Sequence, residues 1–447
     1  MNPLARPLEL PCGVTLKNRI AKAAMSEGLA DPDDRASAEL ATLYGRWSDG
    51  GAGLLITGMV MVDRRFLERP GSLVIDDNGG FDALQRMAEA GTRNGNHLWM
   101  QLGHPGRQSA RASGHQPVSA SSVKMKGMLG QIDAPRALEI KEIHEVIRAF
   151  ARAAKTAKDA GFTGVELQAA HGYLLNQFLS PYTNRRTDAW GGSLENRARF
   201  LLQTYRAVRE SVGDAFPVAV KLNSSDFQKS GFTHQESAQV ARWLCEDGID
   251  LLEISGGTYE QLALFGRPAE GEKRAESTLR REAFFLEYAS HIREVARGVP
   301  LMVTGGFRTV SFIRDVIERG EIDVVGVARP MCVAPDLPTE MLQGTVTELP
   351  TPEKDRRLGP GLLGPVSPFR SVRTLNNQAE IAWFYRQILA LSEGREPDLS
   401  LRTRAALKAH FRDTAALARR RSLRPMPEPA PAPNEADASP RTADGGL

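Results

Sequence analysis

Three polar side chains stand close together in the segment ELQAAHGYLLNQ, and their types suit acid catalysis on a carbonyl compound. Gln168 and His171 are three positions apart and can both donate hydrogen bonds to one carbonyl oxygen, which stabilises negative charge as it develops there. Tyr173 follows two positions later and carries a phenol that can deliver a proton. A lone histidine or tyrosine more often belongs to a packed polar network. The three residues are therefore candidate catalytic residues if the chain builds a site around them.

Two further polar residues interrupt apolar segments. Lys221 lies within VAVKL, and Gln101 lies within LWMQLGHPGR. A buried ammonium needs an anionic partner because an unpaired buried charge is prohibitively costly, so one interpretation is an ion pair with a carboxylate such as Glu166. The other interpretation is that the cation and the amide face a ring with carbonyl groups that becomes negative on reduction. That description fits the pyrimidine side of a flavin.

Small residues and an arginine end the last two apolar segments of this type, as Gly305-Gly306 and Ala328-Arg329. Small residues let backbone N–H groups approach an anion, and the loops after the seventh and eighth strands are the usual phosphate site of α/β barrels. Arg329 can bind a phosphate in a bidentate manner. The glycine pair alone is equally typical of a tight turn, but together with Arg329 it favours a phosphate site.

Short apolar segments rich in β-branched residues alternate with stretches of helical periodicity along most of the chain. We expect strands at 19–25, 53–59, 97–103, 164–170, 217–224, 251–257, 300–306 and 323–330. Eight strand–helix repeats predict a parallel sheet closed into a (β/α)8 barrel, whose chemistry lies at the carboxyl ends of the strands. An open doubly wound sheet also alternates, but GxGxxG does not follow the first expected strand. The preceding segment LELPCGVTLKN predicts a hairpin turning at Cys12-Gly13, at the bottom of the barrel.

The pattern changes after about residue 345. We expect a barrel over 1–345, a C-terminal helical extension over 346–424 and a disordered tail over 425–447, where Pro, Ala, Glu and Ser dominate. One amphipathic helix should end at Gly394, and a second should carry Leu407, Phe411 and Ala418. The second helix is strongly basic. The extension is therefore expected to pack on the barrel or on a second subunit, with its basic face exposed and without a catalytic role.

The bulk properties limit the class of protein. The 447 residues are 41% hydrophobic and 25% charged, which is enough for a large core, and a net charge of +3 indicates no nucleic-acid or membrane partner. Cys12, Cys245 and Cys332 lie too far apart for a thiolate cluster or a zinc site, so no metal is expected. The start of the chain does not read as a signal peptide, and no segment is long enough to span a membrane. We expect a cytoplasmic protein that acts on a small molecule and can form a homo-oligomer.

Four segments carry a resemblance to the old yellow enzyme family of FMN-dependent ene-reductases, from the hairpin to about residue 340. They are NRIAKAAM, QLGHPGR, HGYLLNQFLSPYTNRRTDAWGGSLENRARFL and TGG followed by ARP. The resemblance implies non-covalent FMN. The residues implied to border its ring are Ala24, Met25, Ser26, Gly58, Gln101 and Lys221, and those implied to hold its phosphate are Gly305, Gly306, Ala328 and Arg329. By the same resemblance, His171 and Gln168 would face the substrate and Tyr173 would be the proton donor.

The activity that this resemblance implies is hydride transfer from NADH or NADPH, through the flavin, to the activated C=C bond of an α,β-unsaturated carbonyl compound. The sequence departs from the family at Gln168, the first position of a pair that is usually His with Asn or two His, and at Ser26, which is often Thr or Cys. A flavin-dependent amine dehydrogenase or demethylase on the same barrel is the alternative. A barrel that only binds a phosphate-bearing ligand is another.

Overall fold

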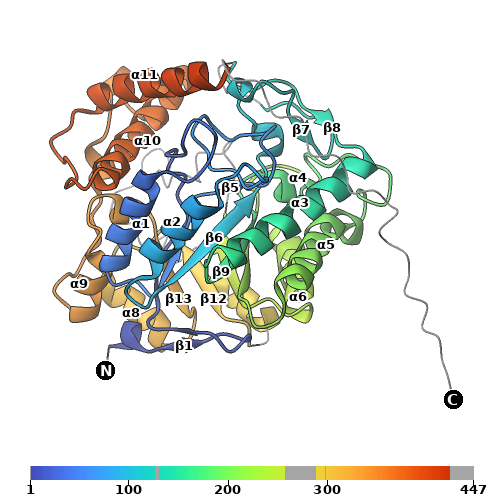
Figure 1. The fold of residues 1–447 in the computed structure, drawn as a ribbon, viewed down its shortest axis with the longest axis horizontal. Coiled ribbons are helices and arrows are strands. Elements are labelled where there is room, and N and C mark those ends of the chain that lie inside the picture. The colour runs from blue at the N-terminus through green and yellow to red at the C-terminus, as the bar shows by residue number, and fades with distance from the viewer. Residues whose placement is uncertain (1, 126–129, 257–287, 297, 423–447) are drawn as a thin grey trace.

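The computed structural model describes residues 2–125, 130–256, 288–296 and 298–422 (Figure 1). Its centre is a ring of eight parallel strands: β3 (Ile20–Lys22), β4 (Leu54–Ile56), β6 (His97–Gly103), β9 (Gly164–Ala169), β10 (Val218–Asn223), β11 (Leu251–Ser255), β12 (Leu301–Thr304) and β13 (Val324–Val327). Each strand pairs with the next in parallel register, and β13 pairs with β3, which closes the ring. The predicted (β/α)8 barrel is confirmed.

Helices surround the ring of strands and cover its outer face (Figure 1). They are α1 (Ala38–Asp49), α2 (Phe81–Thr92), α3 (Ile140–Asp159), α5 (Leu194–Val212), α6 (His234–Glu246), α8 (Val310–Glu318) and α9 (Leu337–Gln343), and residues 288–296 are also helical. Helix α3 shows why these segments form. Glu139 and Glu142 make a reciprocal capping box at its first turn, and its apolar stripe, which includes Ile143 and Phe150, is buried against the sheet.

Shorter elements lie in the loops between these helices and strands. They are β5 (Val60–Met61), which extends the edge of β6; β7 (Val118–Ser119) and β8 (Arg136–Ala137), which pair with each other; the short helix α4 (Leu174–Leu179) after β9; and single turns such as η5 (Arg329–Cys332) after β13. Most of these elements follow the carboxyl ends of barrel strands. The polypeptide at this end of the barrel is therefore more elaborate than a set of short turns, and such loops carry the functional groups of α/β barrels.

The predicted N-terminal hairpin is present and closes the opposite end of the barrel. It consists of β1 (Leu8–Glu9) and β2 (Thr15–Leu16) in antiparallel pairing. Gly13 lies in its turn with φ of 84°, a conformation that favours glycine. Three leucines of the hairpin form one buried cluster with barrel-interior side chains that include Trp99 and Met302. The hairpin thus fills the bottom of the barrel and leaves the carboxyl ends of the strands as the open end.

The extension consists of two long helices that pack on each other, α10 (Arg370–Ser392) and α11 (Thr403–Ser422). Helix α10 also packs against α1 and η5, and its buried Trp383 donates a hydrogen bond from the indole N–H to the Leu401 carbonyl at 2.9 Å. In Figure 1 both helices lie over one side of the open end of the barrel. The predicted disordered tail, 425–447, lies outside the described residues.

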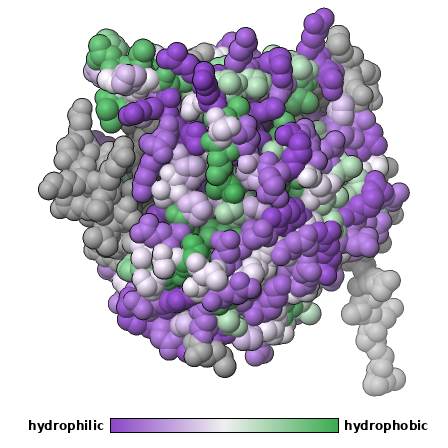
Figure 2. Space-filling model, turned by 90° about the vertical axis from the view of Figure 1, so that its left-hand side faces the viewer, coloured by the Kyte–Doolittle hydropathy of each residue, from purple (hydrophilic) through white to green (hydrophobic). Residues whose placement is uncertain are grey.

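The surface on the side of the extension is mainly hydrophilic, with apolar side chains gathered in a few patches (Figure 2). The segment before α10 contributes four apolar residues that are more than half exposed: Leu362, Leu363, Val366 and Phe369. Among the described residues, no helix combines the length and the apolar character needed to cross a membrane. The same residues contain no cluster of three or more His, Cys, Asp or Glu side chains arranged to hold a metal ion.

Candidate active site

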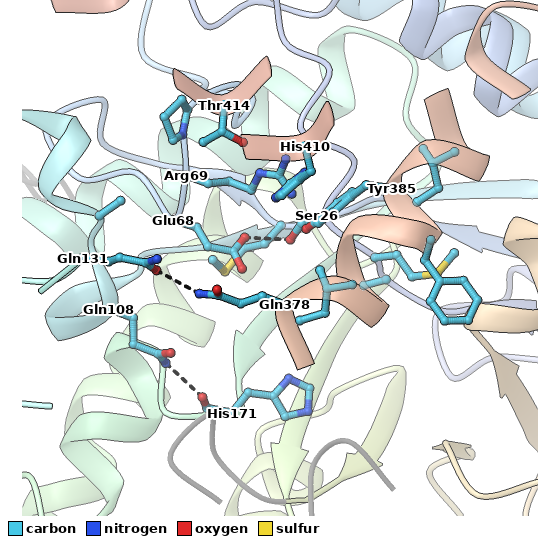
Figure 3. A pocket seen from close by; sticks show the side chains of 18 of the residues that line it. Ser26, Glu68, Arg69, Gln108, Gln131, His171, Gln378, Tyr385, His410 and Thr414 are labelled. Carbon is cyan, nitrogen blue, oxygen red and sulfur yellow. Dashed lines mark hydrogen bonds between the residues drawn. The ribbon is translucent and has the colours of Figure 1, made fainter. Parts of the chain in front are cut away.

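A cavity of about 880 Å³ lies between the carboxyl ends of the barrel strands and the helices of the extension (Figure 3). Nine of the residues singled out from the sequence line it: Ala24, Met25, Ser26, Gln101, Gln168, His171, Tyr173, Lys221 and Arg329. The structure therefore brings together residues from five different strand ends. Four others, Gly58, Gly305, Gly306 and Ala328, are not among the residues that line the cavity.

The glycines that do not line the cavity shape the chain around it. Gly58 donates its N–H to Glu27 Oε1 at 2.8 Å, and a Cβ atom at this position would overlap Glu27 and the backbone of Met25 and Ser26. Its lack of a side chain thus lets the loop after β3 approach the end of β4. Gly305 and Gly306 adopt φ angles of 105° and 81° directly after β12, in the region that favours glycine. The chain bends at the glycine pair.

The ammonium of Lys221 pairs with Glu253, at 2.5 Å, rather than with Glu166 as the sequence suggested. The strand register explains the difference. Lys221 and Glu253 are directly opposite each other on β10 and β11, whereas Glu166 is opposite Gln101 on the pair β6 and β9. Side chains of opposite residues point to the same face of a sheet and lie close together. Glu166 accordingly accepts a hydrogen bond from Gln101 Nε2 at 2.6 Å.

The two buried carboxyl groups, Glu166 and Glu253, have pKa values shifted in opposite directions. Burial, and after it the charge of Glu253, raises the pKa of Glu166 well above its ordinary value. Burial acts in the same direction on Glu253, but the Lys221 charge and the hydrogen bonds to this carboxyl together outweigh it and lower its pKa. Of the two carboxyls, Glu253 is therefore the one that more readily carries the negative charge opposite Lys221, and Glu166 the one that more readily holds a proton. The floor of the cavity thus combines an ammonium with an amide, and the charge of the ammonium is matched.

His171 is held in an unusual backbone conformation at the end of β9. Its φ is 60°, which is uncommon for a residue with a side chain. Its N–H donates to Asn223 Oδ1 at 3.0 Å, and its carbonyl accepts from Gln108 Nε2 at 2.9 Å (Figure 3). The ring Nε2 lies 2.7 Å from Ser255 Oγ. Burial, and after it the Lys221 charge, lowers the pKa of His171 to about 3, so its imidazole is neutral near pH 7.

The Tyr173 hydroxyl donates a hydrogen bond to Glu68 Oε1 at 2.7 Å. The other oxygen of this carboxylate, Oε2, accepts from Ser26 Oγ, also at 2.7 Å (Figure 3). Glu68 therefore links the loop after β3 to the start of α4. Gln168 lies on β9, and its Nε2 donates to Gln101 Oε1 of the neighbouring strand β6 at 3.3 Å. Every polar side chain of this part of the cavity is thus oriented by a neighbour.

The extension packs on the barrel, as one of the two expected arrangements has it, and there it forms one wall of the cavity. Helix α10 contributes residues that include Glu380, Phe384 and Tyr385, and α11 contributes His410 and Phe411. Arg329, from η5, forms an ion pair with Glu380 at 2.9 Å. The amphipathic pattern of α10 and α11 predicted two helices that bury an apolar face. It contained no information about which part of the barrel that face would cover.

Sequence reasoning also missed two adjacent residues of the cavity, Glu68 and Arg69. They lie in the segment DRRFLERPGS, which follows β5 at the open end of the barrel. A signal for them existed, because charged residues beside Pro-Gly in a loop after a barrel strand are at the position where barrels carry their chemistry. Their partners could not be found in this way, since Tyr173, Ser26 and Tyr385 are distant in the sequence.

The donor groups of the cavity fit a flavin nucleotide. Gln101 and Lys221 offer an amide and an ammonium on the floor, which suits a ring with carbonyl groups. Arg329 follows β13, the strand paired with β12, and offers a guanidinium that suits a phosphate. The volume is also in the range of cofactor sites. A closed (β/α)8 barrel with these donors at its open end is the architecture of a barrel-type flavin oxidoreductase.

Comparison with known proteins gives the family. The model of the NADH:flavin oxidoreductase / NADH oxidase family matches residues 3–348. The chain is 38% identical over 353 residues to NADH-dependent flavin oxidoreductase iccE of Talaromyces variabilis, covering 75% of this chain and 85% of that protein. It is 35% identical over 404 residues to NADH-dependent flavin oxidoreductase iliE of Neonectria sp., covering 86% of this chain and 51% of the relative, so it spans about half of that relative's length.

Among solved structures, an old yellow enzyme homologue from Zymomonas mobilis is similar with a TM-score of 0.64 and 25% identity, covering 78% of this chain and 94% of that one. The chain belongs to the NADH:flavin oxidoreductase / NADH oxidase family. It is an oxidoreductase with FMN as its cofactor and a nicotinamide as its reductant. The resemblance to the old yellow enzyme family is confirmed.

Proposed function

We propose that this enzyme reduces the activated C=C bond of α,β-unsaturated carbonyl compounds with electrons from NADH or NADPH. The observation that carries this proposal is that Gln168, His171 and Tyr173 line the same cavity as the donors Gln101 and Lys221. FMN, when bound, supplies the hydride chemistry between the nicotinamide and the β-carbon of the substrate. A reducing, cytoplasmic compartment is part of the proposal, because all three cysteines are free.

The proposed roles rest on the positions of the side chains that line the cavity and, for the residues that do not line it, on the family resemblance. Lys221 and Gln101 face the ring, together with Ala24, Met25, Ser26 and Gly58 of the neighbouring strand ends; Gly305, Gly306, Ala328 and Arg329 hold the phosphate. On the substrate side, a neutral His171 has one N–H to donate. If the Ser255 hydroxyl donates to Nε2, then Nδ1–H and the Gln168 amide are the donors for the substrate carbonyl. Tyr173 then delivers a proton to the α-carbon.

Anaerobic half-reactions test this proposal directly. The flavin absorbance of the purified enzyme should be bleached by NADH or NADPH and then restored by 2-cyclohexenone, with cyclohexanone as the product. An amine dehydrogenase or demethylase on the same barrel would behave in the opposite way, because an amine would bleach the flavin and the enone would not restore it. Purified protein without flavin bands, even after incubation with FMN, would contradict both functions.

Replacement of Arg329 by Ala should weaken FMN binding by about 1.5–3 kcal/mol, because a charge-assisted hydrogen bond to the phosphate is lost. The dissociation constant can be measured by titrating apoenzyme with FMN and following flavin fluorescence. Glu380→Gln is the matched control, since it breaks the same ion pair with α10 but keeps the guanidinium. If both variants lose FMN equally, the contribution of Arg329 is the docking of the extension rather than the phosphate.

A chain that ends at Arg402 lacks α11 and should melt at a lower temperature than the full chain, because the buried contacts of Ala406 and Leu407 with α10 are lost. Each kcal/mol lost corresponds to about 2–4 °C in a protein of 150–250 residues, and less in a longer one, so we expect a fall of a few degrees. A chain that ends at Arg424 keeps α11 and should melt like the full chain. An unchanged melting temperature for the shorter chain would contradict the packing described above.

A further inference from the structure

The cations of the cavity differ in whether a carboxylate neutralises them. Three of them form ion pairs: Lys221 with Glu253, Arg111 with Asp133 and Arg329 with Glu380. Arg69 also lines the cavity, and it forms no ion pair with any residue within the part of the chain that the structure describes. It is half-buried, in the loop between β5 and α2. A positive charge at the edge of a largely apolar cavity attracts an anion from whatever molecule fills that cavity.

The guanidinium of Arg69 is held in place by the extension. Its Cζ lies 3.8 Å from the centre of the Tyr385 ring of α10. Tyr385 in turn stacks in parallel with His410 of α11, with the ring centres 5.3 Å apart and the ring planes 1° apart. A guanidinium that lies over an aromatic ring uses its face for that contact and keeps its N–H edge for acceptors. Such an edge binds a carboxylate or phosphate in a bidentate manner.

The neighbouring carboxylate of Glu68 does not take this role. Its two oxygens accept hydrogen bonds from Tyr173 and Ser26. Figure 3 shows Arg69 next to His410 and Thr414 at one end of the cavity, and His171 with Gln108 at the other. A molecule whose carbonyl oxygen is bound by His171 can thus extend its far end towards Arg69.

We propose that Arg69 binds an anionic oxygen group of the molecule that occupies the cavity. The group is either the carboxylate of an acidic unsaturated substrate or a phosphate of the nicotinamide nucleotide, since both present the same acceptor geometry. The proposal rests on the function proposed above for the position of the ligand, and it adds a charge requirement to that function. Tyr385 and His410 are positioning residues in this proposal, because they hold the guanidinium and do not bind the anion themselves.

The test measures binding to the oxidised holoenzyme by calorimetry, so that it requires no turnover. The probes are 4-carboxycinnamaldehyde, its methyl ester, and the non-reducing tetrahydro forms of NADH and NADPH. Arg69→Gln should weaken the binding of one class of anionic probe by roughly 10- to 100-fold, because it removes a charge-assisted bidentate contact. If Arg69→Gln loses affinity for the acid but not for the ester, the anion is a substrate carboxylate. If the variant loses affinity for the nucleotides and binds the acid and the ester as the wild type does, the anion is a nucleotide phosphate.

Arg65→Gln is the matched control, since it removes a positive charge from the same loop at a residue that does not line the cavity. If Arg69→Gln binds all four probes as the wild type does, the proposal is wrong. If the Arg69→Gln variant does not fold, the Arg69→Lys variant is tested in its place. Lysine keeps the charge but cannot bind in a bidentate manner, so the same probe should lose part of its affinity, and full affinity would overturn the proposal. Failure of enones to reoxidise the flavin would contradict the proposed function but leave these binding results unaffected.

Discussion

Replacement of Tyr173 by Phe should slow the reoxidation of reduced enzyme by an enone about 100-fold or more, and leave its reduction by NADH or NADPH nearly unchanged. The phenol is the proton donor of the proposed reaction and acts only in the second half-reaction, so its loss removes general-acid catalysis from that half alone. The Tyr173 side chain is buried, and its hydroxyl is fixed at 2.7 Å from Glu68. The phenylalanine ring can therefore occupy the same space. Stopped-flow absorbance of the flavin measures both halves separately.

The control for this variant is Tyr182→Phe, which removes a phenol that does not line the cavity. It should leave both half-reactions unchanged. Equal losses in the two halves for Tyr173→Phe would mean that Tyr173 positions the cofactor or packs the loop that carries Glu68, rather than donating a proton. An unchanged rate in both halves would mean that water or another group delivers the proton to the α-carbon.

Replacement of Lys221 by Met should cost about 3–5 kcal/mol of unfolding free energy near neutral pH, because it leaves the buried carboxylate of Glu253 without its counter-charge. FMN should also be retained poorly, since the cation proposed to face the ring is lost. Denaturant titration of the apoprotein gives the stability, and flavin release gives the affinity. Lys229→Met, at an exposed position in the loop after the same strand, should stay within about 0.5 kcal/mol of wild type.

The same variant should show a defined dependence on pH. Without Lys221, burial raises the folded-state pKa of Glu253 above its unfolded value, so the folded state binds more protons. Its stability should then fall as the pH rises through and above the unfolded pKa, and the deficit should be smaller at pH 5 than at pH 8. The double variant Lys221→Met/Glu253→Gln removes both charges and should recover much of the stability but not the FMN affinity. If the double variant does not recover stability, the broken ion pair is not the cause of the stability lost in Lys221→Met.

The sequence alone determined the barrel and nine of the residues that line the cavity at its open end. Strand and helix formation depend on local periodicity, and eight repeats of the unit close a barrel whatever the details of its loops. Residues placed at the ends of predicted strands must then meet at one end of that barrel, which is why Gln101, Gln168, His171, Lys221 and Arg329 could be assigned to one site before any distance was known. The N-terminal hairpin could be placed at the opposite end for the same reason.

Contacts across the sheet and across the chain were decided only by the tertiary structure. The partner of Lys221 is Glu253 rather than Glu166, because pairing depends on the register between neighbouring strands, and local pattern does not specify register. The hydrogen bond from Tyr173 to Glu68 joins residues 105 positions apart. The contact of Arg69 with Tyr385 brings α10 onto the open end of the barrel. An amphipathic helix specifies that one of its faces is buried but not the surface that buries it, so the wall that the extension adds to the cavity could not be derived from the sequence.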